Sequence, residues 1–241
     1  MLLEIFSDTV CPWCYIGKRR LERAIRLRPQ PGLTRRWRAF QLNPGLPATG
    51  MDRRQYMVAK FGSLDRANRL YEAVARVGAQ EGIRFAFDRI ARTPNTVRSH
   101  RLLYAAAEEG KQPDLLELIF AAYFTEGQDI GDPDVLSDLG DEAGLSAGAI
   151  ADALIDGGRL DSAMTEDLQS RRIGINGVPF FVFNGRFGLS GAQEPEALLN
   201  MLDLAREEDT QKGVALSTAE RDGLLPVPVA LPSEAFRDIE R

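Results

Sequence analysis

The sequence predicts an α/β fold in which a large all-helical insertion divides one sheet between the two ends of the chain. Three observations carry this prediction: strand patterns within residues 2–42, helical patterns from 52 to 172, and strand patterns again at 178–189. We therefore divide the chain into an amino-terminal part of the sheet domain (1–50), a helical insertion domain (51–172), a carboxy-terminal part of the sheet domain (173–208) and an extended tail (209–241).

The amino-terminal part has the pattern of a β–α–β unit. Leu2–Ser7 is a strand with apolar residues on both faces, as in a buried strand. Apolar residues then recur at helical spacing over Tyr15–Arg28, and Pro29 ends that helix. Leu33–Leu42 is the second strand. Two cysteines therefore lie between the first strand and the helix, at the carboxyl end of that strand.

Capping residues mark the helices expected in the insertion. The expected helices run from Ser63 to Val77, from Asn95 to Glu109, from Pro113 to Phe124 and from Arg159 to Arg172, and two further helices begin at Asp132-Pro133 and at Ser146. No strand pattern interrupts them, so we expect the insertion to be helical throughout, to cover the active site and to contribute the substrate groove.

A sequence pattern typical of a β-strand returns at Val178–Phe183. The pair Asn184-Gly185 predicts a two-residue hairpin, after which Arg186–Leu189 pairs back. Glu194-Pro195 then opens a helix through about Glu207. Prolines recur in the tail from 209 to 241, which predicts an extended segment on the surface or on a partner.

Composition excludes several classes of function. The formal net charge is −5, so no general attraction to nucleic acid is expected. No apolar run is long enough to span a bilayer, and the first residues lack the pattern of a secretory signal. We therefore expect a cytosolic protein that binds neither nucleic acid nor membrane. The chain has two cysteines, which leaves no sulfur for a structural disulfide outside this pair.

Those cysteines form the run Cys11-Pro12-Trp13-Cys14. Disulfide exchange needs a thiolate nucleophile and a second thiol that resolves the mixed disulfide. At a helix start, free N–H groups and the helix dipole favour a thiolate at the first cysteine. Cys11 should therefore attack and Cys14, one turn further on, should resolve. The alternative is half a zinc site, but zinc normally takes four ligands and the chain adds only one histidine, His100.

Pro179 is the second candidate site residue. A proline that leads a strand is tolerated at its first position or on an edge strand. A cis bond between Val178 and Pro179 would free the Val178 backbone to pair with a substrate chain. A trans bond is the default for an isolated X–Pro sequence, so the residues by themselves leave both forms open.

Two segments resemble the signatures of the DsbA-like family: Ser7-Asp8-Thr9-Val10-Cys11-Pro12-Trp13-Cys14-Tyr15-Ile16-Gly17 and Gly174-Ile175-Asn176-Gly177-Val178-Pro179-Phe180-Phe181-Val182-Phe183. Within that family the chain is similar to the cytosolic FrnE-like branch. Further support comes from Pro94-Asn95-Thr96 with His100-Arg101 and from Ser190-Gly191-Ala192-Gln193. The resemblance covers residues 1 to about 207.

The resemblance implies a thioredoxin fold split by a helical domain, with Pro179 in cis beside Cys11. It implies a thiol–disulfide oxidoreductase whose catalytic residues are Cys11, Cys14 and Pro179 and whose redox centre is the Cys11–Cys14 disulfide. No tightly bound cofactor and no metal are expected. Substrates would be proteins or small thiols and disulfides, glutathione would be a co-substrate, and a homodimer is left open. Trp13 stands where secreted DsbA proteins usually carry histidine.

Four further residues are candidates for substrate contact: Val178, Trp13, Asn95 and His100. For Asn95 the simpler role is a helix cap, and for His100 a residue of an amphipathic helix. The alternative function is a glutathione-dependent isomerase or kappa-like glutathione transferase acting on a small molecule. Those relatives carry serine at the position of Cys11, which favours disulfide exchange here. A third hypothesis is a non-catalytic binding module.

Overall fold

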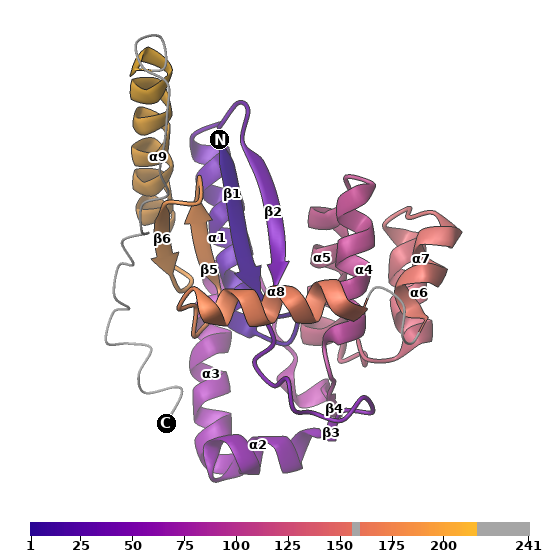
Figure 1. Cartoon of the computed structure of the whole chain (residues 1–241). Coiled ribbons are helices and arrows are strands. Elements are labelled where there is room, and N and C mark those ends of the chain that lie inside the picture. The colour runs from indigo at the N-terminus through magenta and orange to yellow at the C-terminus, as the bar shows by residue number, and fades with distance from the viewer. Residues whose placement is uncertain (156–159, 216–241) are drawn as a thin grey trace.

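A computed structural model describes residues 1–155 and 160–215. Its centre is a four-stranded mixed sheet in the order β2-β1-β5-β6 (Figure 1). Strands β1 and β2 are parallel, and β1–β5 and β5–β6 are antiparallel. The strands are β1 (Leu2–Ser7), β2 (Thr34–Ala39), β5 (Phe180–Phe183) and β6 (Phe187–Ser190). The two ends of the chain thus supply one sheet, because β5 pairs directly with β1.

Helix α1 (Pro12–Leu27) connects β1 to β2. It begins at Pro12, as expected for a helix that starts at the dithiol, because a proline at the first helical position leaves no N–H unpaired. It packs against α9 (Pro195–Ala215), and both helices contact the core beneath the sheet. Buried residues of α1 include Ile16, Leu21 and Ala24.

The middle of the chain is mostly helical. Its helices are α2 (Arg53–Phe61), α3 (Leu64–Gln80), η1 (Phe87–Arg89), α4 (Val97–Glu108), α5 (Gln112–Ala121), η2 (Ala122–Glu126), α6 (Pro133–Glu142), α7 (Ala147–Leu154) and α8 (Leu160–Arg172). The predicted caps Ser63, Asp132 and Ser146 are confirmed: each side chain accepts a hydrogen bond from a backbone N–H in the first turn. In Figure 1, α2 and α3 lie beyond the carboxyl ends of β1 and β2, and α4 to α7 lie beside β2.

The expectation of an insertion without strands is wrong. Strands β3 (Met51–Asp52) and β4 (Arg92–Thr93) form a short antiparallel pair within it. Each has two residues, too few for an alternating apolar pattern to reveal. The division into four parts at residues 50, 172 and 208 stays a prediction.

Several element ends also differ from the prediction. Helix α5 ends at Ala121 and is followed directly by the π-helical turn η2, whereas the sequence predicted one helix to Phe124. The hairpin turn holds three residues, 184–186, since Phe183 pairs with Phe187. Helix α9 continues to Ala215, so residues 209–215 are helical and not extended; the predicted tail beyond them lies outside the described residues.

The helices of the insertion close the edge of the sheet at β2. The N–H groups of Trp37, Ala39 and Gln41 point away from β1 and donate to side chains of α5 and α8. The acceptors are Gln112 Oε1 (2.9 Å), Glu166 Oε2 (3.0 Å) and Asp167 Oδ1 (2.8 Å). Gln112 also donates to the Trp37 carbonyl at 3.0 Å. Buried backbone groups need such partners, so the insertion is bound to the sheet as well as packed against it.

One apolar core runs from the sheet into the insertion. Fully buried members come from the sheet, such as Ile5 and Phe181, and from α4 and α5, such as Leu102 and Phe120. Tyr56, Met57 and Ala67 form a smaller cluster between α2 and α3. Within the described part of the chain, no helix combines the length and the apolar character that a membrane crossing needs.

Candidate active site

The two cysteines lie where β1 gives way to α1. Cys11 is the residue before the helix, with extended backbone angles (φ −94°, ψ 112°), and its N–H donates to the Asp8 carbonyl at 3.0 Å. Its own carbonyl accepts from the Cys14 N–H at 3.0 Å, which starts the helix. Both cysteines are free thiols here, and both are buried.

Cys14 is the more deeply buried thiol, with no exposed surface. This burial raises its pKa well above the ordinary value, and the neighbouring Cys11 acts in the same direction. The Ser7 hydroxyl and the Asp8 backbone oppose the rise. Cys14 is thus held as a neutral thiol near pH 7, which suits the resolving role expected for it.

The loop before β5 brings the second signature segment to Cys11. The Val178–Pro179 bond is cis, as the resemblance implies. The Cys11 thiol donates to the Val178 carbonyl with Sγ and O 3.6 Å apart. Pro179 is in turn held by its carbonyl, which accepts from the Gly191 N–H at 2.8 Å. The structure therefore brings Cys11, Val178 and Pro179 together across 168 residues of sequence.

Gly17 allows this approach. A Cβ at this position would lie 2.9 Å from Cγ of Pro179, closer than side-chain carbons pack. The absence of a side chain lets the second turn of α1 rest on the proline ring. Gly17 belongs to the first signature segment, but its packing role is a finding of the structure.

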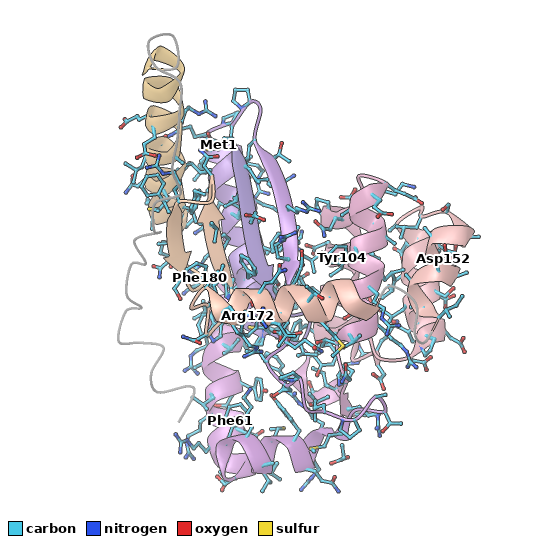
Figure 2. All side chains as sticks on the ribbon, viewed as in Figure 1. Met1, Phe61, Tyr104, Asp152, Arg172 and Phe180 are labelled. Carbon is cyan, nitrogen blue, oxygen red and sulfur yellow. The ribbon has the colours of Figure 1, made fainter. Side chains whose placement is uncertain are left out.

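An apolar groove of about 140 Å³ opens beside Cys11. Its walls come from the dithiol loop, the loop before β5, and helices α2 and α3. The lining residues are Val10, Cys11, Pro12, Trp13, Leu42, Tyr56, Lys60, Phe61, Leu70, Tyr71, Ala73, Val74, Gly177 and Val178. Figure 2 shows Phe61 at the turn between α2 and α3, below the sheet. Burial raises the pKa of Tyr56 to about 12, so this phenol stays protonated at neutral pH.

Two of the four predicted substrate contacts lie in this groove, Trp13 and Val178. Asn95 lines a separate cavity of about 320 Å³ between α4 and α8. The residue before α4 is Thr96, and Asn95 supports that helix start in a different way, because its carbonyl oxygen accepts from the Val97 N–H. Its amide also donates to the Leu46 carbonyl at 2.7 Å. The groove geometry gives Asn95 no support as a substrate contact.

His100 is also outside the groove. It is buried in the first turn of α4, where its Nε2 lies 3.5 Å from Asp8 Oδ1. The other carboxylate oxygen of Asp8 accepts from the Leu42 N–H at 2.6 Å. His100 therefore contacts the loop that carries the cysteines from within the protein, and the predicted contact with substrate has no support in this position.

Sequence reasoning expected the insertion to contribute the substrate groove, but it did not name the residues of α2 and α3 that form the groove wall. The signal was present: Tyr56 and Lys60 are four residues apart, as are Leu70 and Val74, so each pair shares a helix face. What the pattern did not contain was the direction in which that face points.

A buried arginine lies behind the groove. Arg53 is 6% exposed, its guanidinium stands 4.7 Å from the ring centre of Tyr71, and it donates to Thr93 Oγ1 at 3.1 Å. No ion pair joins it to an acid within residues 1–155 and 160–215. Tyr71 also lines the groove, so this positive charge lies one side chain away from it. Within the same described ranges, no cluster of three or more histidine, cysteine or acidic side chains could hold a metal ion.

Comparisons with known proteins agree with this geometry. The sequence model of the DSBA-like thioredoxin domain matches residues 2–203. The crystal structure of a probable DsbA oxidoreductase from Streptomyces coelicolor is 29% identical, with a TM-score of 0.78 over 97% of this chain and 100% of that chain. The Bacillus subtilis protein YwbO, itself uncharacterized, is 27% identical over 157 residues, 63% of this chain and 70% of YwbO.

A second similar structure is that of the cytosolic disulfide reductase DsbM from Pseudomonas aeruginosa with GSH. It is 23% identical, with a TM-score of 0.57 over 89% of this chain and 100% of that chain. At this level of sequence identity, the similarity to DsbM shows a shared fold alone. The expected fold class, a thioredoxin fold carrying a helical insertion, is confirmed.

Proposed function

Since this chain belongs to the DSBA-like thioredoxin domain family, we propose that it is a thiol–disulfide oxidoreductase that works through Cys11 and Cys14. The observation that carries the proposal is the setting of Cys11. It lies at the start of α1, within hydrogen-bond reach of the Val178 carbonyl, and it lines an apolar groove. The finer assignment to the FrnE-like branch is part of the proposal.

The reaction has two steps. The Cys11 thiolate attacks one sulfur of a substrate disulfide, which forms a mixed disulfide and releases one substrate thiolate. Cys14 then loses its proton and attacks Cys11 Sγ, which breaks the mixed disulfide and releases the second substrate thiolate. The protein gains the Cys11–Cys14 disulfide and the substrate is reduced by two electrons. The reverse sequence donates a disulfide.

Pro179 and the groove position the substrate. The Val178 backbone faces Cys11, so an extended substrate segment that pairs there would hold its sulfur near the nucleophile. Trp13, Leu70 and Val74 offer apolar surface to the residues around the substrate cysteine. This arrangement favours protein or peptide disulfides with apolar neighbours.

The direction of the reaction depends on the reduction potential of the Cys11–Cys14 pair. A dithiol in the cytosol rests mostly reduced. A cytosolic setting, which is part of this proposal, therefore favours reductase or isomerase activity over net oxidation.

Glutathione is the small thiol that the proposal includes. The Pseudomonas neighbour was solved with GSH, and the positive charge of Arg53 behind the groove suits a ligand with carboxylates. One glutathione thiolate would attack the Cys11–Cys14 disulfide to form a mixed disulfide, and a second glutathione would attack that mixed disulfide, which releases glutathione disulfide and regenerates the dithiol. This same observation keeps a glutathione-dependent isomerase or transferase as the second candidate function.

Two assays test the proposal together. Insulin reduction in the presence of glutathione should proceed with the wild-type protein and stop with Cys11→Ser, because the nucleophile is lost. Conjugation of glutathione to an electrophile such as 1-chloro-2,4-dinitrobenzene should remain at background. Conjugation without insulin reduction would favour the second candidate instead.

A further inference from the structure

The apolar groove beside Cys11 carries a positive charge at its rim. Among the described residues that line it, Lys60 is the one cation, and none is an acid. Lys60 is exposed and lies near the end of α2, one residue before Phe61, which Figure 2 labels at the turn between α2 and α3. The charge that an incoming substrate meets in this groove is therefore positive.

Two contacts hold the Lys60 ammonium at the groove wall. Lys60 and Tyr56 are one helical turn apart on α2, and the Lys60 Nζ lies 5.6 Å from the ring centre of Tyr56. Asn43 Oδ1 accepts from the Lys60 Nζ at 3.4 Å and from the Tyr56 hydroxyl at 3.3 Å. Because Tyr56 also lines the groove, these contacts keep the ammonium beside it.

The Lys60 ammonium has donors left for a ligand. An ammonium has three N–H donors, and one of them goes to Asn43. Within residues 1–155 and 160–215, no acidic side chain forms an ion pair with Lys60, whereas Lys18 and Lys111 are each paired with glutamate. Lys60 is therefore available to a carboxylate that enters the groove.

A second cation behind the same wall acts in the same direction. The Arg53 guanidinium stands 4.7 Å from the ring centre of Tyr71 and 5.6 Å from that of Tyr56, and both tyrosines line the groove. Arg53 is buried, and salt screens a buried charge less than an exposed one. The acid of the dithiol loop, Asp8, is buried outside the groove, and its carboxylate accepts from the Leu42 N–H. The wall from α2 thus favours a negatively charged ligand.

We propose that Lys60 selects disulfide substrates with an acidic residue close to the cysteine that Cys11 attacks; this inference rests on the exchange reaction proposed above. The substrate sulfur lies at Cys11, apolar neighbours contact the groove wall, and an aspartate or glutamate of the same segment accepts from the Lys60 ammonium. This ion pair forms on binding and adds no step to the chemistry at sulfur. Attraction between opposite charges also speeds encounter. The substrate class is therefore acidic peptide disulfides.

Matched peptide disulfides test this selectivity on the full chain. Three peptides carry the same disulfide and differ only in the residue beside the cysteine, which is glutamate, glutamine or lysine. Acid quench and mass spectrometry give the second-order rate constant for reduction of each peptide by the reduced protein. The wild type should reduce the glutamate peptide about fivefold faster than the glutamine peptide, and the lysine peptide more slowly than both. Raising the salt from about 20 mM to about 500 mM should shrink this preference.

Two variants and a matched control assign the preference to Lys60. Lys60→Gln should lower the preference for the glutamate peptide to at most about twofold, because Arg53 remains. Lys60→Glu should reverse it, so that the lysine peptide reacts faster than the glutamate peptide. Arg54→Gln is the control, since Arg54 is an exposed cation on the same helix that does not line the groove. It should keep the wild-type preference.

The outcomes are distinct. Equal rate constants for the glutamate and glutamine peptides in the wild type, or the same preference in wild type and Lys60→Glu, would overturn the inference and leave the exchange reaction intact. If no peptide is reduced, the exchange reaction itself fails, and calorimetry with peptides that carry serine for cysteine decides the inference separately. Tighter binding of the glutamate peptide that is lost in Lys60→Glu would support it, and equal affinities would overturn it.

Discussion

The two sides of the dithiol have opposite surroundings. Cys11 lines a groove whose wall, from α2 and α3, is mostly apolar. Cys14 is fully buried, and the side chains on its side, Ser7, Asp8 and His100, are polar. Cys11 thus lies beside an apolar surface that a substrate can contact, whereas Cys14 lies beside buried polar side chains.

This difference shows what the insertion adds to the sheet domain. The cysteines and Pro179 come from the sheet domain, whereas α2 and α3 supply the groove and α4 supplies His100. The same inserted segment therefore equips both sides of the dithiol. Variants in the insertion should therefore change the surroundings of the dithiol while leaving both cysteines in place.

The largest expected effect comes from removing the resolving thiol. Cys14→Ala leaves Cys11 in its groove but takes away the only route to the internal disulfide, so turnover with insulin should be lost. The mixed disulfide at Cys11 should accumulate and be visible by mass spectrometry. If Cys14→Ala turns over at the wild-type rate, the two sides do not divide the work as described.

The contact between α1 and Pro179 offers a stability test. Gly17→Val would place side-chain carbon against the proline ring, where a Cβ already lies 2.9 Å from Cγ. Overpacking of this kind costs about 2 kcal/mol of unfolding free energy. Gly148→Val in α7 is the control, because nothing lies within 4 Å of its added Cβ. Urea unfolding should separate the two variants clearly; equal stability would mean that α1 can shift away from the loop.

The raised pKa of Cys14 predicts a pH dependence of stability. Above a pH of about 8.5 an unfolded cysteine loses its proton, while Cys14 in the folded protein keeps it. The unfolded state then binds fewer protons, so the unfolding free energy of reduced protein should fall with rising pH, by at most about 1.4 kcal/mol per unit. Below pH 8.5 this contribution is fully present.

The useful window for this measurement ends near pH 10. All five tyrosines have raised pKa values and add a fall of the same sign above that pH. Denaturant titrations between pH 8 and 10 should show the slope in wild-type protein and a smaller slope in Cys14→Ala. An identical slope in both would rule out Cys14 as its source.

The smallest effect is expected in the groove wall. Leu70→Ala removes apolar surface beside Cys11 and should lower kcat/KM for a peptide disulfide with apolar flanks by about fivefold, which corresponds to about 1 kcal/mol. A small charged disulfide should react as before. The matched control is Leu168→Ala on α8, which lines another cavity and is 55% exposed. An equal loss in both variants would point to a general effect on folding.

The sequence allowed the dithiol and the split sheet to be predicted because their signals are local. The β–α–β pattern, the two cysteines and the strand after Pro179 each lie within short segments, and the resemblance joins them. Capping side chains such as Ser63 and Asp132 were also predictable, since a cap bonds within its own helix turn.

The residues that line the groove were not predictable, because tertiary packing brings them together. Tyr71 and Cys11 line the same groove because of the angle at which α3 crosses the end of the sheet, and no period in the sequence records that angle. His100 had two expected roles, and its buried position beside Asp8, 92 residues earlier, supports the role within the helix, while contact with substrate stays a prediction. The strands β3 and β4 were not predicted, because a strand of two residues is too short to show an alternating apolar pattern.

The hydrogen bonds along β2 have a consequence for the protein in solution. An outer strand with free backbone groups is a template on which another chain can add a strand, and this is a common route to aggregation. Gln112, Glu166 and Asp167 occupy the outward N–H groups of β2 from within the same chain. A protein shortened by removing the insertion would keep its cysteines and its strands, yet it would present a bare edge to its neighbours. The insertion therefore closes this edge of the sheet to strands of other chains, in addition to anything it does for chemistry.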